Sequence, residues 1–172
     1  MRVWVISDTH WNHKNIVEYE NRDPNYNQIL IDNWNKVVKP DDLVIHLGDV
    51  IFSQSGQLSD ILGQLKGTKI LTLGNHDQKK PQWYMNKGFA VACEYFVFRN
   101  ILFSHKPRPV PDDLKYCVHG HFHDNDHRSK EFQNYDWYTK NLDQYYLVNI
   151  ESDLAPQRLD DIVKTFESRT TV

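Results

Sequence analysis

The chain has 172 residues, of which 40% are hydrophobic, and a formal net charge of −3. This length suits one domain with a substantial core, residues 1–172, and the composition is not that of a disordered protein. The acidic balance counts against a dedicated binder of long nucleic acid without excluding one. No apolar run approaches the roughly 18 residues of a membrane span, and the start does not resemble a signal peptide, so no membrane contact is expected.

Short segments rich in β-branched or aromatic residues predict strands, and segments with helical periodicity predict helices. In chain order, the expected strands are Arg2–Ser7, Leu43–Leu47, Lys69–Leu73, Ala90–Phe98, Ile101–Ser104, Tyr116–His119 and Tyr145–Ile150. The expected helices are Asn27–Val38, Gln57–Leu65, one that begins near Pro81, and Leu159–Phe166. A β-α-β-α-β first half and a strand-rich second half predict an α/β fold, a sandwich of two sheets flanked by helices.

A long polar segment lies between the last two expected strands. Asp124–Gln144 runs for 21 residues and contains Tyr135, Trp137 and Tyr138. Loops of this length without regular structure are uncommon in compact domains and are often functional. Two interpretations stay open: a surface excursion whose aromatic rings dock on the core, or a lid or partner-binding segment.

Two cysteines, Cys93 and Cys117, form no paired motif. They are expected to be small buried strand residues, and this usage suits a reducing compartment, which predicts a cytoplasmic location.

Side chains that commonly bind metals follow five of the expected strands. The five blocks are Asp8-Thr9-His10, Gly48-Asp49, Gly74-Asn75-His76-Asp77, Ser104-His105 and Gly120-His121-Phe122-His123. Each block alone has an ordinary interpretation as a turn, a helix cap or a surface imidazole. Together they predict one metal site, because ligands in α/β folds gather beyond the carboxyl ends of the strands. Imidazole favours zinc, iron, manganese or nickel over calcium or magnesium.

The order DxH, GD, GNHD, SH, GHxH resembles that of the calcineurin-like metallophosphoesterase superfamily. In detail the chain is similar to the small, cap-less members, whose first motif often continues as His-x-x-His-x-Asn. Here that string is His10-Trp11-Asn12-His13-Lys14-Asn15, and the Asn-Arg pair that tends to follow is Asn21-Arg22. The resemblance covers nearly the whole chain.

The resemblance implies a complete dinuclear site. Asp8, His10 and His123 would hold one metal ion, and Asn75, His105 and His121 the other. Asp49 would bridge the two, and His76 would be the catalytic histidine, oriented by Asp77 or its neighbourhood. The implied cofactor is a pair of divalent metal ions, with manganese as the first expectation and iron, zinc or nickel as alternatives.

Two cations about 3.5–4 Å apart hold a bridging water and lower its pKa, so that hydroxide exists near neutral pH. The expected activity is therefore hydrolysis of a phosphate ester by a metal-bridging hydroxide, without a covalent intermediate. The expected substrate is a small phosphate ester, a nucleotide among the candidates, which makes the chain a phosphodiesterase or a phosphatase. Two alternatives stay open: a metal-dependent nuclease on RNA or DNA, and a metal-binding interaction module without catalysis. The sequence does not predict an oligomeric state.

Five further side chains are candidates for substrate contact: His13, Asn15, Arg22, Lys106 and Arg108. Surface placement is the alternative for the first two. Arg22 offers a fork that matches two phosphate oxygens, although Asp23 beside it could engage it in a plain ion pair. Lys106 and Arg108 lie in a proline-rich loop, at the expected rim of the cleft.

Three other features are expected to be less direct. His46 and His119 are predicted to be structural or to support the site. Trp11, Trp83 and Trp137 are candidates for stacking on a base, with ordinary packing as the alternative. After the last strand the chain reads Asn149-Ile150-Glu151-Ser152-Asp153, where relatives often show an Asn-Val-Gly string, so the shape of that edge is not predicted.

Overall fold

A computed structural model describes residues 1–52, 57–123 and 130–169. Its first sheet has five strands in the order β4-β3-β2-β1-β9. They are β1 (Val3–Ile6), β2 (Leu43–His46), β3 (Thr68–Thr72), β4 (Val91–Cys93) and β9 (Gln157–Arg158). The first four run parallel to their neighbours, and β9 lies antiparallel to β1. The parallel arrangement brings the carboxyl ends of β1, β2 and β3 to one edge.

The second sheet has four strands in the order β5-β6-β7-β8. They are β5 (Tyr95–Phe98), β6 (Ile101–Ser104), β7 (Tyr116–His119) and β8 (Tyr145–Leu147). The prediction of one strand over Ala90–Phe98 is wrong: β4 pairs with β3 in the first sheet and β5 pairs with β6 in the second. The chain changes sheets at Glu94, and a continuous run of strand-forming residues gives no sign of that bend.

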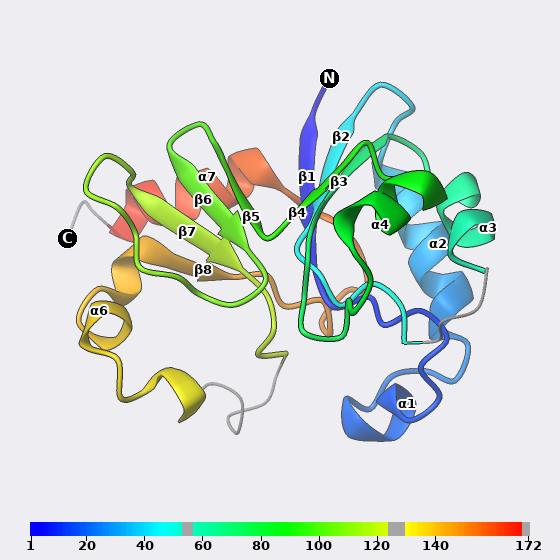
Figure 1. Cartoon of the computed structure of the whole chain (residues 1–172), viewed down its shortest axis with the longest axis horizontal. Coiled ribbons are helices and arrows are strands. Elements are labelled where there is room, and N and C mark those ends of the chain that lie inside the picture. Colours follow the sequence, from blue (N-terminus) through cyan, green and yellow to red (C-terminus); the bar gives the residue numbers. More distant parts are fainter. Residues whose placement is uncertain (53–56, 124–129, 170–172) are drawn as a thin grey trace.

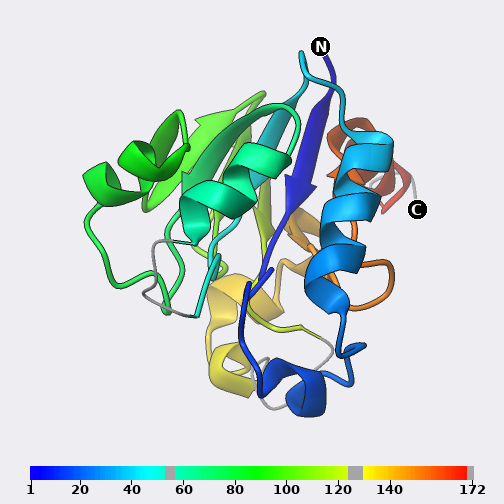
Figure 2. The ribbon, with the colours of Figure 1, turned by 90° about the vertical axis from the view of Figure 1, so that its right-hand side faces the viewer.

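Helices flank the sheets, which confirms the predicted α/β sandwich. The main ones are α2 (Tyr26–Val37), α3 (Leu58–Gln64), α4 (Pro81–Lys87) and α7 (Leu159–Arg169). Helices α2, α3 and α4 cover one face of the first sheet, as two perpendicular views show (Figures 1 and 2). A short helix α1 (Ile16–Tyr19), which the sequence does not predict, follows the first motif. None of the helices within the described ranges is long and apolar enough to cross a membrane.

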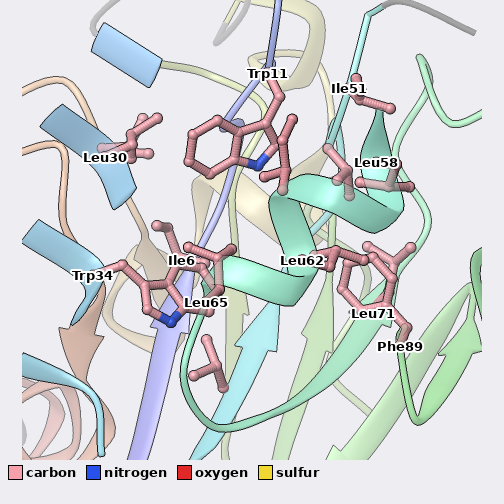
Figure 3. Packing of buried hydrophobic residues seen from close by; sticks show 14 of the residues in the cluster. Ile6, Trp11, Leu30, Trp34, Ile51, Leu58, Leu62, Leu65, Leu71 and Phe89 are labelled. Atoms are coloured by element: carbon pink, nitrogen blue, oxygen red, sulfur yellow. The ribbon is translucent and has the colours of Figure 1, made fainter. Parts of the chain in front are cut away.

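Alternation along β1 divides the core. Trp4 and Ile6 face α2 and α3, where they join a cluster with Leu30, Trp34 and Leu71 (Figure 3). Val3 and Val5 face the opposite way and pack in a second cluster, whose other members come from both sheets and from α7: Ile45, Leu47, Ile101, Phe103, Val118, Val148, Leu159, Ile162 and Phe166. Because side chains alternate along a strand, β1 contributes to the hydrophobic clusters on both faces of the first sheet.

The described part of the predicted excursion, 130–144, is not structureless. It contains η1 (Lys130–Phe132), α6 (Asp136–Thr139) and η2 (Leu142–Gln144). Trp137 and Tyr138 pack against a small cluster around buried Cys117, while Cys93 in β4 is half-buried. These contacts favour an excursion whose aromatic rings dock on the core. Residues 124–129 lie outside the described part of the chain.

We expect the core beneath α3 to be sensitive to truncation. Leu71 is fully buried in the first cluster, near Leu62 and Phe89 (Figure 3). Leu71→Ala should lower the free energy of unfolding by about 3 kcal/mol, because it removes buried methyl groups and leaves a cavity. Leu142→Ala is the matched control, since Leu142 is 54% exposed, and should cost little. Urea denaturation of the metal-free proteins measures both, and equal effects would contradict the assignment of this core.

Candidate metal centre

The loops after the strands bring the five sequence blocks to one edge of the sandwich. Asp8 N donates to Gly48 O at 3.0 Å, and His10 N donates to Asp49 O at 3.0 Å, so the first two blocks run side by side. The backbone there is unusual, because five expected ligands have positive φ: Asp8 (52°), His10 (47°), Asp49 (53°), His121 (73°) and His123 (52°). Residues other than glycine rarely adopt this left-handed conformation, and it concentrates at functional sites.

Two glycines in the motifs are required by close approach. A Cβ on Gly120 would overlap the Ser7 hydroxyl and the Asp8 carboxylate. A Cβ on Gly74 would overlap the carboxylate and backbone nitrogen of Asp49. Each motif glycine therefore lets one expected ligand block pack directly against another.

A first group of donors surrounds the Asp8 carboxylate. Asp8 Oδ1 lies 3.4 Å from His123 Nε2 and 3.9 Å from His10 Nε2. His10 Nε2 lies 3.7 Å from Asp49 Oδ2, which links this group to the next. The other Asp8 oxygen, Oδ2, accepts from the Ser7 hydroxyl at 2.5 Å and from His121 N at 2.9 Å, so Oδ1 is the atom directed into the site.

A second group lies on the other side of Asp49. His105 Nε2 is 3.4 Å from Asp49 Oδ2, 2.9 Å from Asn75 Oδ1 and 3.2 Å from His121 Nδ1. His105 Nδ1 lies 2.8 Å from Leu47 O and donates to it, which leaves the Nε2 lone pair directed toward the site. The structure thus brings together all seven residues predicted as metal ligands, with Asp49 between the two groups.

The donor atoms of the site fit a cation better than they fit one another. Asp8 Oδ1, Asp49 Oδ2, His10 Nε2 and His123 Nε2 are buried and have no hydrogen-bond partner among the described residues. An unpartnered polar atom in the interior costs about 1–3 kcal/mol, and more when it is charged. Two clusters, Asp8-His10-His123 and Asp49-His105-His121, each offer donor atoms within 4.8 Å of one another, as a metal ion requires.

Burial raises the pKa of two carboxylates of the site, whereas burial of Asp8 is outweighed by the neighbouring histidines, His123 foremost, which lower its pKa. Burial raises the pKa of Asp49, and the nearby negative charge of Asp8 adds to the effect. It also raises the pKa of Asp77 to about 6, with a further contribution from Asp49. The raised pKa values of Asp49 and Asp77 mean that the metal-free site holds its negative charge at a cost, which a bound cation would remove.

His76 lies at the open side of this centre, with its side chain 36% exposed. Its backbone N donates to Asp49 Oδ1 at 2.8 Å, and its ring Nε2 lies 3.9 Å from Asp49 Oδ2. The expectation that Asp77 orients this ring needs correction. The Asp77 carboxylate accepts instead from the backbone nitrogens of Asp49, Val50 and Gly74, at 2.8, 3.1 and 2.8 Å. Asp77 therefore joins the second and third blocks to each other.

Two histidines that the sequence predicts to be structural or supporting lie in the interior. His46 and His119 are both almost fully buried, and burial lowers their pKa values to about 3 and 4. Their rings are therefore neutral near pH 7. The His46 ring is 2.9 Å from the Thr9 hydroxyl, between Asp8 and His10, so it supports the first block.

The first candidate substrate residues have structural partners. His13 is buried and its Nδ1 accepts from Ile16 N at 3.0 Å, at the start of α1. Its ring centroid lies 5.7 Å from that of His10 and 3.8 Å from that of Phe52. Asn15 is exposed at the N-terminus of α1. The ring of His13 is therefore beside the metal centre, while Asn15 is on the surface.

Arg22 lies behind the centre and does not face its open side. Its side chain is 1% exposed and pairs with Glu151, not with Asp23, at 2.5 Å. It also donates to the backbone oxygens of Thr9 and Asp8 at 2.9 and 2.8 Å. The prediction that Arg22 binds phosphate is therefore wrong. Its Nε, Nη1 and Nη2 all donate to acceptors of the protein itself, so its role is structural.

Lys106 and Arg108 lie at the rim, as expected from their loop. With Asn75 and His105 they line a shallow hollow of about 390 Å³. Lys106 Nζ is 2.9 Å from Glu131 Oε1, and Arg108 is 3.5 Å from Glu94 and lies over the Tyr95 ring. Both ion pairs are exposed, and such pairs contribute little and exchange readily. Contact with substrate remains a prediction for these two side chains.

Two carboxylates that the motifs do not identify reach the histidines of the last block. Glu151 Oε1 lies 2.6 Å from His123 Nδ1, and Glu131 Oε2 lies 3.5 Å from His121 Nε2. Both lie outside the five blocks, Glu151 in the turn after β8 and Glu131 in the excursion. The departure at 149–153 from the usual family string is the only sequence signal for Glu151, and the sequence carries none for Glu131.

Comparison with known proteins identifies the family of the chain. The chain matches the calcineurin-like phosphoesterase family over residues 1–168 and belongs to that family, as its motifs predict. These proteins are metallophosphoesterases, which typically hold two divalent metal ions and act as hydrolases on phosphate esters.

An uncharacterized protein of Methanocaldococcus jannaschii is 33% identical over 99% of this chain and 94% of its own length. The gene 66 protein of Mycobacterium phage D29 is 36% identical over 47% of this chain and 43% of its own. Among solved structures, a protein of unknown function from Aquifex aeolicus has a TM-score of 0.71 at 24% identity, covering 95% of this chain and 98% of that one. A nuclease from Pseudomonas putida has a TM-score of 0.53 at 17% identity, over 71% of this chain and 62% of that one. Both structures establish likeness of fold alone.

We expect Asp49→Asn to stabilise the metal-free protein. A carboxyl whose pKa is raised by folding favours the folded state only when protonated, so its penalty develops as the pH rises above the ordinary value of 3.8. At pH 7 the variant should melt about 2–4 °C higher than the parent, and this gain should vanish near pH 4. Thermal melts in chelator at both pH values measure it. Added Mn²⁺ should raise the melting temperature of the parent more than that of the variant.

Proposed function

We propose that this protein hydrolyses a small, nucleotide-like phosphate ester at a centre of two divalent metal ions. The observation that carries the proposal is the set of four buried donor atoms without hydrogen-bond partners in the described structure, together with His76 at their open side. Buried carboxylates and imidazoles directed at one another without partners are costly unless a cation lies among them. Manganese is the metal that we expect, with iron, zinc and nickel as alternatives.

Asp8, His10 and His123 would hold one ion, and Asn75, His105 and His121 the other, with Asp49 shared. When bound, the two ions would supply hydroxide at neutral pH and neutralise charge on the phosphate oxygens. His76 is the side chain that meets the substrate. Its ring, exposed on one side and 3.9 Å from Asp49, is placed to donate a hydrogen bond to a phosphate oxygen and a proton to the leaving oxygen.

A hollow of about 220 Å³ beside His76 supports a nucleotide-like substrate. Its walls include Phe52, Trp83 and Tyr84, with Gln78 among the polar lining. Because His76 lines the same hollow, a group placed there would be attached to the oxygen that His76 protonates. Flat aromatic walls suit a nucleobase, and stacking of one base on an aromatic side chain contributes about 1–3 kcal/mol. The other two candidate tryptophans pack elsewhere: Trp11 is in the core, and Trp137 lies against the second sheet.

A nuclease is the alternative within the same chemistry. The fold shared with the Pseudomonas putida nuclease is compatible with it, and Lys106 and Arg108 are cations near the centre. The net charge of −3 and the small aromatic hollow favour the small substrate. A panel of nucleoside monophosphates, cyclic nucleotides, dinucleotides and oligonucleotides, assayed with Mn²⁺, tests the choice. Preference for oligonucleotides would select the nuclease, and no turnover of any ester by the metal-loaded protein would remove the enzymatic proposal.

Two substitutions should separate metal binding from chemistry. His76→Ala should retain two Mn²⁺ ions and lose activity by about 10²- to 10⁴-fold, because it removes only a proton donor and phosphate contact. Asp49→Ala should lose both activity and the paired ions, since Asp49 contacts both groups of donors. Metal analysis after gel filtration and turnover of a chromogenic diester measure the two effects. Normal two-metal content in Asp49→Ala would contradict the shared-ligand assignment.

Trp83→Ala tests the aromatic hollow. In the parent, a nucleoside monophosphate should inhibit hydrolysis of a chromogenic diester at lower concentration than ribose 5-phosphate, which lacks the base. The variant should narrow this difference by about 10-fold, as loss of one stacked ring predicts. Trp137→Ala makes the same deletion on the far sheet and should leave the difference unchanged. If both variants keep it, the base binds elsewhere.

A further inference from the structure

A buried ion pair lies directly behind one of the expected metal ligands. Glu151 Oε1 is 2.6 Å from His123 Nδ1 and 2.5 Å from Arg22 Nη2, while Glu151 Oε2 accepts from Arg22 Nε at 2.7 Å. The three side chains are 6%, 0% and 1% exposed for Glu151, His123 and Arg22. Glu151 and Arg22 are 129 residues apart in the chain, so the contact exists only in the folded protein.

We propose that Glu151, held by Arg22, is a positioning residue for the first metal ion. An ionised carboxylate can only accept, so a contact of 2.6 Å means that His123 Nδ1 carries a proton and donates a hydrogen bond to Glu151. In the neutral ring, the form that binds a metal ion, the lone pair of His123 is then on Nε2, the atom that lies 3.4 Å from Asp8 Oδ1. Glu151 thus fixes both the tautomer and the direction of the ring. The inference rests on the proposed metal centre but not on hydrolysis.

Arg22 also helps to position Asp8 and His10, the other two ligands assigned to that ion alone. Its Nη1 and Nη2 donate to the backbone oxygens of Thr9 and Asp8. These oxygens belong to the turn in which Asp8 and His10 both have positive φ. One guanidinium therefore fastens the strained first block and, through Glu151, the His123 ring. Removing it should loosen the three ligands that belong to that ion alone, whereas Arg22 donates to none of the ligands assigned to the other ion.

A third cation site at this group fits the contacts less well. Glu20, His123 and Glu151 offer atoms within 4.8 Å of one another, the spacing that a cation requires. A cation there would have to compete with the guanidinium, since both Glu151 oxygens accept from Arg22. Glu20 Oε1 also lies farther away, 4.0 Å from His123 Nδ1. A purely structural ion pair accounts poorly for the group as well, because buried pairs are often no more stabilising than apolar side chains of the same size.

The test is metal binding without substrate. Calorimetric titration of the parent protein with Mn²⁺ should resolve two binding steps. Glu151→Gln keeps an oxygen that accepts from His123 but removes the charge, and should weaken one step by about 10-fold. The double variant Arg22→Met/Glu151→Met removes the acceptor and should weaken that step by about 100-fold, yet it leaves no unpaired buried charge and should still fold. The second step should change little in either variant.

Asp160→Asn is the matched control. Asp160 also pairs with an arginine, at 2.8 Å from Arg158, but its side chain is 45% exposed and it contacts no expected ligand. It should bind both ions as the parent does. The visible absorption of Co²⁺-loaded protein gives a second readout, because a rotated His123 changes the ligand field while a general loss of stability does not. We expect an altered spectrum for the Glu151 variants and none for the control.

Folded Glu151→Gln and double variants that bind both ions like the parent, with the same Co²⁺ spectrum, would overturn the inference and leave the proposed function standing. Equal weakening of both steps would also overturn it, since that result indicates a general structural role. If the parent itself binds no divalent ion, the proposed function falls and the inference falls with it.

Discussion

The buried carboxylate of Asp49 is the constraint on which the rest of the structure depends. It is fully buried, its Oδ1 accepts from His76 N, and its Oδ2 lies 3.4–3.9 Å from Nε2 of three histidines without a hydrogen bond to any described residue. Such an atom is costly in a protein interior, so the surroundings must hold it there until a cation compensates it. The parallel sheet does this: β1, β2 and β3 end at the same edge, and Gly74 allows the third block to close over Asp49.

The strain in the loops follows from the same demand. Five expected ligands have left-handed backbone, at a cost on the order of 1 kcal/mol or more each. The compensation is local and polar: Asp77 accepts three backbone N–H groups from the second and third blocks, and Arg22 donates to two carbonyls of the first. Neither side chain reaches the centre of the site. Both side chains instead hold the turns that carry the expected ligands. This role explains why Arg22 points into the protein and not toward the open side of the site.

How far the sequence predicts this protein depends on whether a property is local. The ligand blocks were predictable because each follows a short apolar strand, and parallel strands bring such blocks together. The sheet change at Glu94 was not, since 90–98 is strand-like throughout and only pairing with β3 or β6 divides it. The partners of Arg22 and His123 were also hidden, because Glu151 is more than a hundred positions from one and 28 from the other. Local patterns thus identified the donors of the site, while long-range contacts set their orientation.

The residues that would bind metal and the residues that would select the substrate lie in different parts of the structure. The atoms that would bind metal and activate water lie just beyond the strand ends, in turns that hydrogen bonds from Asp77 and Arg22 hold in place. The features that would recognise a particular ester are the hollow beside Phe52 and Trp83, and the exposed ion pairs of Lys106 and Arg108. They lie on loops and on α4, which tolerate replacement of side chains more readily than the buried strands do. A fixed centre surrounded by adjustable walls is therefore how one fold could serve many phosphate esters, and the walls of this chain favour a flat aromatic group.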